Sequence, residues 1–205
     1  MKKRKILLVT ERRADFSRFK PILDKIKKEK NLDYILVVTG IHLLKKYGYS
    51  INEIKKTKIK NNHQFKMYSN VSVKNDDGAS MVAAFGTAII NLSKILKKYK
   101  PDIVLSGFDI AANFAVTVAA AHMNIPVAHI QGGEVSGTID ESIRHAMSKF
   151  SHYHLVSNRD AYKRLVKMGE KKSKIHIVGC PSIEALFNEK LIPEKNLQKK
   201  FGIDF

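Results

Sequence analysis

Three glycines, three acids and an arginine lie close together in one polar stretch of the chain, the segment 129–144. Gly132 and Gly133 follow an apolar run, and glycine lets a backbone approach a ligand closely or adopt a positive φ. Asp140 and Arg144 are four residues apart, so on a helix they share one face. A glycine loop that leads into such a helix could bind an anionic substrate and exchange protons with it.

The same segment also has a purely structural interpretation. Thr138 and Glu141 have the spacing of a capping box, in which both side chains satisfy free amides at a helix start. Asp140 and Arg144 would then form a surface ion pair worth roughly a few tenths of a kcal/mol. Capping does not explain why acids cluster with Arg144 beside a glycine pair, so both interpretations stay open at this point.

Three further candidate side chains lie within or just after apolar runs. Asp109 comes just after the run 102–106, and an acid at the mouth of a parallel sheet is a common catalytic position, although it could equally cap the next helix. His42 follows the run 34–39 and is placed to face a ligand. His129 lies inside an apolar run, as a satisfied core histidine does.

Metal and redox chemistry have little support in the sequence. His152 and His154 have a spacing that can bind zinc, but no convincing carboxylate partner is apparent, so we expect no metal. Cys180 is the one cysteine, which excludes a disulfide framework and a cysteine-based zinc site and indicates a packed residue. This cysteine usage is typical of a reducing cytosol, and we expect a cytoplasmic location.

The loops that commonly hold nucleotide cofactors are absent from the sequence. It contains no P-loop, and residues 10–14, Thr-Glu-Arg-Arg-Ala, stand where a dinucleotide-binding fold carries its glycine motif. This argues against ATPase and NAD-dependent dehydrogenase functions, and we expect no cofactor.

Apolar runs alternate with helical patterns along the chain, which predicts βαβ units and a doubly wound parallel sheet. The predicted strands are 5–10, 34–39, 63–68, 102–106, 126–131, 152–157 and 175–179. The predicted helices are 14–30, 78–98, 111–122, 139–150, 160–168 and a short one from 181, with a basic connection over 41–62. Ligands bind at the carboxyl ends of such strands, so Asp109 and the segment 129–144 are expected at one edge.

The composition is ordinary for one large globular domain, with 205 residues and 44% hydrophobic content. No run reaches the ~18 apolar residues of a membrane span, and we expect no membrane association. The net charge is +18, but most of the excess lies in residues 1–60, with 18 Lys/Arg against 6 Asp/Glu, and in 151–205, with 11 against 6, whereas 61–150 hold 8 against 7. No basic stretch is interleaved with aromatic residues, so the charge does not favour nucleic acid as the ligand. The positive charge is equally compatible with a polyanionic small ligand such as a nucleotide.

Five segments together carry the pattern of one known family. They are Arg12-Arg-Ala-Asp15 with Arg18-Phe-Lys-Pro-Ile-Leu23, Val38-Thr-Gly-Ile-His42, Pro101-Asp-Ile-Val-Leu-Ser-Gly107, His129 to Arg144, and Val178-Gly-Cys-Pro-Ser182. Along essentially its whole length the chain resembles the hydrolysing UDP-N-acetylglucosamine 2-epimerases, especially the branch that serves sialic and related nonulosonic acid biosynthesis. The stretch from His129 to Arg144 is the most specific part of the resemblance.

The resemblance implies a two-domain GT-B fold, of which this chain is the N-terminal half. Residues 1–188 would form the Rossmann-like N-terminal domain, and 189–205 a linker towards a C-terminal domain that supplies most uridine and phosphate contacts. We therefore expect the chain alone to be weakly active or inactive. The resemblance also implies a homo-oligomer for the full-length protein.

The implied reaction releases UDP from UDP-N-acetylglucosamine and inverts C2, giving N-acetylmannosamine or a close diacetamido analogue. It proceeds by anti elimination of UDP followed by hydration, and carboxylates suit both steps. By position, Asp109 and Asp140 match acids of the family, and Glu134 is the third catalytic candidate. The implied substrate-binding residues are Arg13, His42, Gln131, Arg144 and Ser182.

Three departures from the family pattern bear on function. The usual Gly-Asp-Arg reads Gly107-Phe-Asp109, Gln131 stands where many members have Glu, and Glu11 replaces a glycine. A glutamine cannot exchange a proton as a carboxylate does, so either Glu134 takes that role or the substrate or chemistry differs. A non-catalytic sugar-nucleotide-binding module is the main alternative, and a glycosyltransferase-like half would share the architecture without the segment 129–144.

Overall fold

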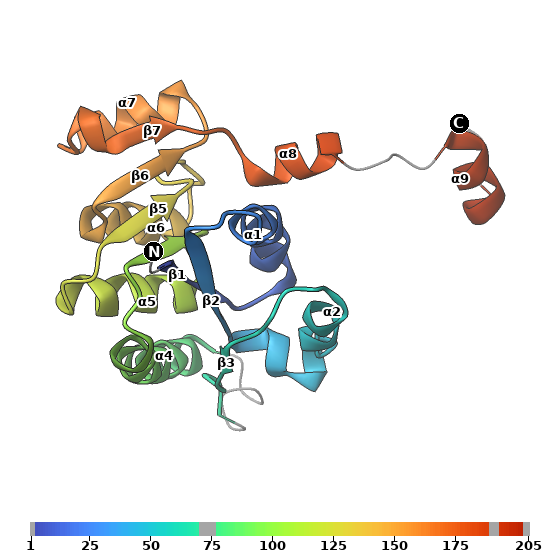
Figure 1. Cartoon of the computed structure of the whole chain (residues 1–205), viewed down its shortest axis with the longest axis horizontal. Helices are drawn as coiled ribbons and strands as arrows, with labels where there is room; N and C mark the ends of the chain where they lie inside the picture. Colours follow the sequence, from blue (N-terminus) through green and yellow to red (C-terminus); the bar gives the residue numbers. More distant parts are fainter. Residues whose placement is uncertain (1–2, 70–76, 189–192, 203–205) are drawn as a thin grey trace.

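A twisted parallel sheet forms the centre of the protein, as Figure 1 shows in a computed structural model that describes residues 3–69, 77–188 and 193–202. Its order is β3-β2-β1-β4-β5-β6-β7, and each neighbouring pair is parallel. The strands are β1 (Arg4–Thr10), β2 (Leu32–Val38), β3 (His63–Gln64), β4 (Ile103–Gly107), β5 (Val127–Ile130), β6 (Tyr153–Val156) and β7 (Ile175–Ile177). The predicted doubly wound α/β class is confirmed.

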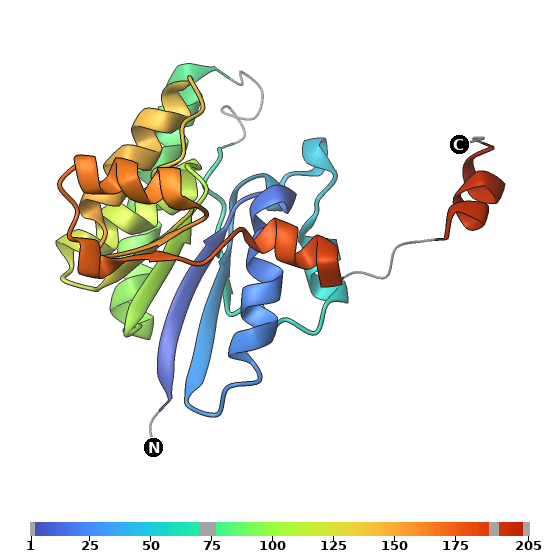
Figure 2. The ribbon, with the colours of Figure 1, turned by 90° about the horizontal axis from the view of Figure 1, so that it is seen from above.

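Helices cover both faces of the sheet (Figures 1 and 2). The helices are α1 (Arg13–Ile26), α2 (Ile51–Lys56), α4 (Gly78–Tyr99), α5 (Ala111–His122), α6 (Ile139–Phe150), α7 (Arg159–Lys167), α8 (Pro181–Asn188) and α9 (Glu194–Phe201), with short 3-10 turns η1 (Gly40–Leu43), η2 (Lys45–Tyr47) and η3 (Lys172–Lys174). Alternate residues of β1 point to opposite faces, so Leu7 packs with α4 and α5, whereas Leu8 packs with α1 and α2. The two faces therefore have separate apolar cores.

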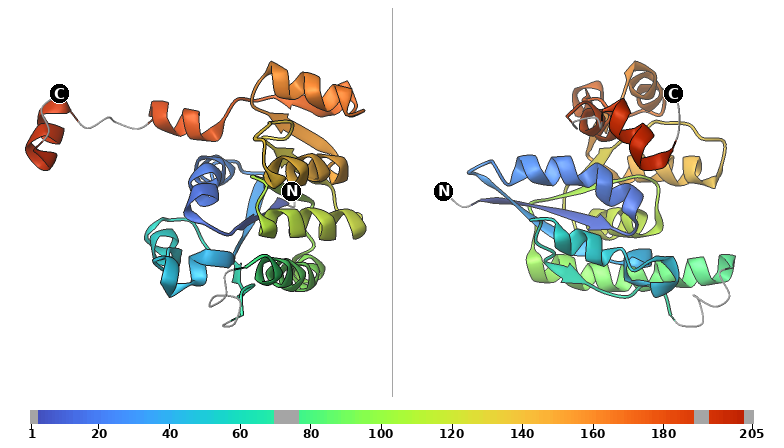
Figure 3. Two further views of the ribbon diagram at one scale, coloured as in Figure 1. Left: turned by 180° about the vertical axis from the view of Figure 1, so that it is seen from behind. Right: turned by 90° about the vertical axis from the view of Figure 1, so that its right-hand side faces the viewer.

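Helix α4 illustrates how a core helix can look like a membrane span. Among the described residues it is the one helix long and apolar enough to cross a membrane by length and composition, with a mean hydropathy of 1.5 over 18 residues. Its inner side, which includes Ala88, Leu92 and Leu96, is buried in the core. The helix lies beside α5, as Figure 3 shows. The apolar composition of α4 is thus partly explained by packing.

Most predicted elements agree with the structure to within a few residues. The predicted helices 111–122 and 139–150 have the observed bounds of α5 and α6. The predicted strand 63–68 is reduced to the two residues of β3, and the predicted helix 14–30 ends at Ile26. The connection 41–62 contains η1, η2 and α2. Of the predicted linker 189–205, residues 189–192 and 203–205 lie outside the described residues, and the part between them carries α9.

The strand order reverses between β1 and β4, because the chain continues from β1 to β2 on one side and from β4 to β5 on the other. In doubly wound sheets a crevice opens at this switch point, outside the carboxyl ends of the strands. The loop that follows β1 and the start of α5, which follows β4, border this crevice. The functional site is therefore to be sought along this edge.

Candidate functional site

An ion pair joins two of the predicted site residues across the carboxyl edge of the sheet. The guanidinium of Arg144, on α6, pairs with the carboxylate of Asp109, which follows β4. Their side chains are only 11% and 19% exposed, so the pair is largely removed from water. A partly buried guanidinium and carboxylate at the end of a parallel sheet form a charged centre that a polar ligand can approach.

The backbone beside this ion pair is held in an uncommon conformation. Phe108 and Asp109 have φ of 69° and 43°, and Gln131, at the end of the neighbouring strand β5, has φ of 58°. All three are non-glycine residues in the left-handed region, which costs roughly 1–2 kcal/mol per residue. Such residues cluster at functional sites, where surrounding contacts fix them. This strain is a feature of the site that the sequence pattern did not reveal.

Two arginines hold the carbonyl groups of the glycine loop. Arg144 Nη1 donates to the carbonyl of Glu134 over 2.8 Å, and Arg164, on α7, donates to the carbonyl of Gly133. The carboxylate of Glu134 accepts a bond of 3.4 Å from the amide of Asn158. Arg164 and Asn158 were not predicted as site residues, because their contribution depends on the approach of α7 to a loop about 30 residues earlier in the chain.

Gly133 is a position where only glycine is compatible with the observed loop. Its φ is +78°, and a Cβ there would lie 2.6 Å from the carbonyl oxygen of Ala161 and 3.0 Å from Cγ of Leu165. We expect Gly133→Ala to lower the free energy of unfolding by about 2–4 kcal/mol, through overpacking and backbone strain together. Urea denaturation of the 205-residue chain measures this loss.

Gly137 provides the matched control for this substitution. Its φ of +68° is similar, but a Cβ there would meet no atom within 4 Å. Gly137→Ala should therefore cost only the backbone term, about 1 kcal/mol. Equal losses for the two variants would show that the close approach of α7 to Gly133 does not constrain the loop.

Asp140 does not form the surface ion pair with Arg144 that the purely structural interpretation offers. Asp140 is exposed in the first turn of α6 and takes part in no ion pair found among the described residues, because Arg144 points instead towards Asp109 and Glu134. The predicted helix start is confirmed in part, since Thr138 accepts from the amide of Asp140. As a catalytic acid Asp140 stays a prediction.

Glu141 binds differently from the predicted capping box. Its carboxylate accepts from the amides of Ser136 and Gly137 over 2.8 and 3.0 Å, before the capping residue Thr138. These two bonds lower the pKa of Glu141, with burial opposing them. Glu141 therefore fixes the loop that leads from the glycine pair into α6.

Gln131 follows β5 and contacts Cys180, the residue just before α8. Its Nε2 donates to Sγ of Cys180 over 3.4 Å, while its Oε1 is buried without a hydrogen-bond partner among the described residues. Leaving a buried acceptor unpaired costs about 1–3 kcal/mol. An amide held in this way at the strand ends is suited to accept a hydrogen bond from a ligand hydroxyl or N–H group.

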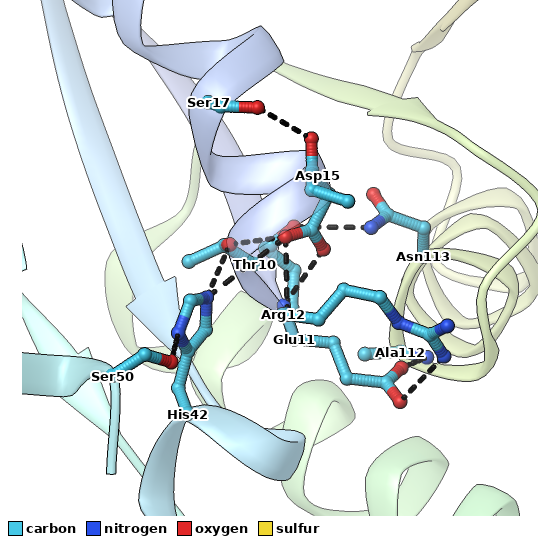
Figure 4. Close-up of polar contacts among 11 residues, drawn as sticks. Thr10, Glu11, Arg12, Asp15, Ser17, His42, Ser50, Ala112 and Asn113 are labelled. Carbon is cyan, nitrogen blue, oxygen red and sulfur yellow. Dashed lines mark hydrogen bonds and ion pairs between the residues drawn. The ribbon is translucent and has the colours of Figure 1, made fainter. Parts of the chain in front are cut away.

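His42 does not face a ligand, contrary to the expectation from the sequence. Its ring is fully buried, with Nε2 2.9 Å from the hydroxyl of Thr10 and Nδ1 2.7 Å from the hydroxyl of Ser50 (Figure 4). Both ring nitrogens are therefore occupied, and burial lowers the pKa of His42 to about 4. The histidine is neutral at pH 7 and joins the β1–α1 loop to the start of α2 as a structural group.

Asp15 is a second buried group of this network and was not predicted as a site residue. Its carboxylate accepts from the Thr10 hydroxyl over 2.7 Å and from the amides of Glu11 and Arg12 over 2.8 and 3.1 Å. Burial raises the pKa of Asp15 to about 6, although these hydrogen bonds act in the opposite direction. Asp15 thus fixes the tight turn from β1 into α1, which carries the adjacent arginines.

Arg13 and Ser182 lie away from the Asp109–Arg144 ion pair. Arg13 is 70% exposed at the start of α1, where it contacts Glu53 at 3.5 Å. Ser182 is exposed on α8 and lines a groove of about 520 Å³ between α8 and α1. The described lining of that groove contains none of the other predicted site residues, so the structure does not bring Ser182 together with them.

The fold and this edge define a Rossmann-like domain of the GT-B type, and comparisons with known proteins narrow the class. A family model described as UDP-N-acetylglucosamine 2-epimerase matches residues 24–203. The chain therefore belongs to the UDP-N-acetylglucosamine 2-epimerase family, as its sequence motifs indicated.

Individual relatives support the same assignment. The chain is 36% identical to a hydrolysing UDP-N,N'-diacetylbacillosamine 2-epimerase of Legionella pneumophila. It is 37% identical to a UDP-N-acetylglucosamine 2-epimerase of Neisseria meningitidis serogroup B. Each match covers 98% of this chain and 52% of the relative. It spans about half the length of these curated relatives. A crystal structure of the Neisseria meningitidis UDP-GlcNAc 2-epimerase bound to UDP-GlcNAc has a TM-score of 0.74 and 22% identity, covering 89% of this chain and 48% of that one, and supports the fold.

Proposed function

We propose that this chain is the N-terminal half of a hydrolysing UDP-N-acetylglucosamine 2-epimerase, converting UDP-N-acetylglucosamine and water to N-acetylmannosamine and UDP, or acting on a diacetamido analogue. The observation that carries the proposal is the Asp109–Arg144 ion pair, which lies at the carboxyl edge of the sheet beside Glu134 and Gln131. Membership of the epimerase family and the names of the two relatives support the substrate class.

The proposed reaction needs groups that transfer protons and a positive charge that stabilises the bound sugar. In the first step a carboxylate removes the proton from C2 while the C1–O bond breaks, and UDP leaves with the bonding electrons. The resulting glycal then takes up water, with hydroxide added at C1 and a proton at C2 on the face that inverts its configuration. We assign these proton transfers to Asp109, Glu134 and Asp140, with Arg144 orienting Asp109.

The complete gene product provides the test of this proposal. Incubation with UDP-N-acetylglucosamine, and separately with a UDP-diacetamido sugar, should release UDP together with the 2-epimeric free sugar, which NMR identifies. Asp109→Asn should lower kcat at least about a hundredfold, because it removes a proton-transferring group. Asp24→Asn is the matched control, since Asp24 is exposed on α1 and pairs with Lys20. Turnover of neither sugar by folded protein would refute the proposal.

Gln131 favours a second candidate, a non-catalytic module that binds a sugar nucleotide. Many members of the family carry a carboxylate at this position, and an amide cannot transfer a proton. The two candidates differ in one result, because a binding module would hold UDP-N-acetylglucosamine without releasing UDP. Gln131→Glu separates them further, since a rise in UDP release would show that the missing carboxylate limits catalysis.

The isolated 205-residue chain is expected to turn over weakly or not at all. It spans 52% of the length of its two curated relatives, and by the resemblance a second domain would supply most contacts to uridine and phosphate. Full turnover by the isolated chain, at the rate of the complete gene product, would contradict this expectation.

A further inference from the structure

Glu11 is a buried acid at the point where doubly wound sheets normally open to a ligand. It follows β1 directly, so it lies beside the switch point between β1 and β4. Its side chain is 0% exposed. The sequence places Glu11 where the family pattern has glycine, a residue without a side chain, so the carboxylate adds both volume and negative charge at this point.

The carboxylate of Glu11 has three hydrogen-bonding partners, two of which, Ala112 and Arg12, are seen in Figure 4. Oε2 accepts from the amide of Ala112 at the start of α5 over 3.0 Å. Oε1 accepts from the hydroxyl of Tyr68 over 3.1 Å and lies 3.4 Å from Nη2 of Arg12. Gly40 leaves the space that Glu11 needs, because a Cβ at Gly40 would overlap the Glu11 side chain. The acid therefore spans the crevice from β1 to α5.

Arg12 connects the buried carboxylate of Glu11 to the protein surface. The Arg12 side chain is 44% exposed, so it reaches from the buried acid to solvent at the edge of the sheet. Part of its positive charge is balanced by Glu11. An anion that approaches the edge at Arg12 thus meets a cation whose attraction is reduced by the carboxylate behind it.

We propose that Glu11 determines where the diphosphate of the substrate binds. Its carboxylate closes the switch-point crevice to the diphosphate and leaves Arg12 as the cation at the entrance of the crevice. The inference rests on the proposed UDP-sugar ligand. The negative charge of Glu11 keeps a second anion out of the crevice, so the diphosphate lies outside it against Arg12, while the sugar reaches the Asp109–Arg144 ion pair. The affinity for the diphosphate is correspondingly moderate.

Pyrophosphate is the probe that isolates this effect, because it carries the diphosphate charge without uridine or sugar. A titration of pyrophosphate into the 205-residue chain at low ionic strength, followed by NMR chemical shifts, measures its affinity. Glu11→Gln keeps the size of the side chain, its carbonyl can accept from the amide of Ala112 and its NH2 group can donate to the Tyr68 oxygen, so the change removes the charge and the contact with Arg12. We expect it to bind pyrophosphate about tenfold more tightly, from the removal of one charge a few Å from the ligand. Asp24→Asn, the same charge change on the exposed side of α1, should change the affinity less than about twofold.

Arg12→Gln keeps the proposal testable if Glu11→Gln fails to fold, because the Arg12 side chain is partly exposed. We expect this variant to bind pyrophosphate about tenfold more weakly than the unchanged chain. The proposal is overturned if Glu11→Gln and Asp24→Asn bind alike, if Arg12→Gln has no effect, or if neither the unchanged chain nor Glu11→Gln binds pyrophosphate. These outcomes are distinct from a failure of the proposed function, which appears as absent UDP release by the complete gene product.

Discussion

Replacing Arg144 with methionine should lower the free energy of unfolding by about 2–4 kcal/mol, because the change leaves two partly buried groups unpaired at once. The carboxylate of Asp109 loses its partner, and the carbonyl of Glu134 loses a charged donor at 2.8 Å. Lysine should restore only part of the loss, since a single ammonium cannot reproduce the fork that serves both acceptors. Urea denaturation of the 205-residue chain provides the values.

A double-mutant cycle shows whether the ion pair itself is responsible. Asp109→Asn combined with Arg144→Met should cost less than the sum of the single changes, with a coupling energy of about 1–2 kcal/mol. Arg13→Met is the control, because Arg13 and its partner Glu53 are both exposed, and such pairs contribute about 0–1 kcal/mol. If Arg144→Met costs no more than Arg13→Met, Arg144 does not organise the site.

Acidification from pH 7 to pH 5 should destabilise the fold by about 2–3 kcal/mol, mainly through two buried histidines. Burial lowers the pKa of His42 to about 4 and that of His129 to about 3, from the ordinary 6.5. The unfolded chain therefore binds protons that the folded chain does not. The contribution of these neutral rings to the free energy of unfolding is complete above pH 6.5 and is lost as the pH falls towards 4. By pH 5 the loss is about 2 kcal/mol for each ring.

Asp15 acts in the opposite direction over the same interval. Its pKa is raised to about 6 from 3.8, so its contribution is complete below pH 3.8 and is lost as the pH rises through 6. Protonation of Asp15 between pH 7 and pH 5 raises the free energy of unfolding by about 1–2 kcal/mol, which offsets part of the histidine effect. The histidines outweigh this single acid, so the net change is a loss of stability.

His129→Gln identifies the source of the pH dependence. Glutamine is similar in size and can still bond Ser148, which lies 3.0 Å from Nδ1 of His129, but it takes up no proton. The variant should lose about 2 kcal/mol less than the unchanged chain between pH 7 and pH 5. His122→Gln, at the exposed end of α5, is the matched control for the substitution itself. If all three proteins lose the same stability, His129 is not responsible.

The sequence predicts the fold well because its signals are local. Alternating apolar runs and helical periods depend on neighbours within one element, so α5 and α6 have the predicted bounds. The strand predicted over 63–68 is shorter in the structure, because pairing with β2 involves only His63 and Gln64. The carboxyl-edge rule also brings Asp109 and Arg144 together, although they are 35 residues apart.

The candidate site is less predictable where side chains choose between distant partners. Arg144 could pair with Asp140 one helical turn away, yet it binds Asp109, and only the approach of α6 to the loop after β4 decides this. His42 looks exposed at the end of a strand, but η1 turns its ring inward between Thr10 and Ser50. Glu11 stands out in the sequence only as a replacement for glycine. Its burial depends on α5 and on Tyr68, which are distant in the chain.

An NMR titration of the 205-residue chain with UDP-N-acetylglucosamine tests most directly whether the edge around the Asp109–Arg144 ion pair is the sugar-nucleotide site. Binding to the isolated chain is expected to be weak, in the millimolar range, which chemical shifts still detect. The largest changes should occur in the amides of residues 107–109, 131–134 and 140–144. Changes confined to other parts of the protein, such as the groove between α1 and α8, would contradict the proposed site.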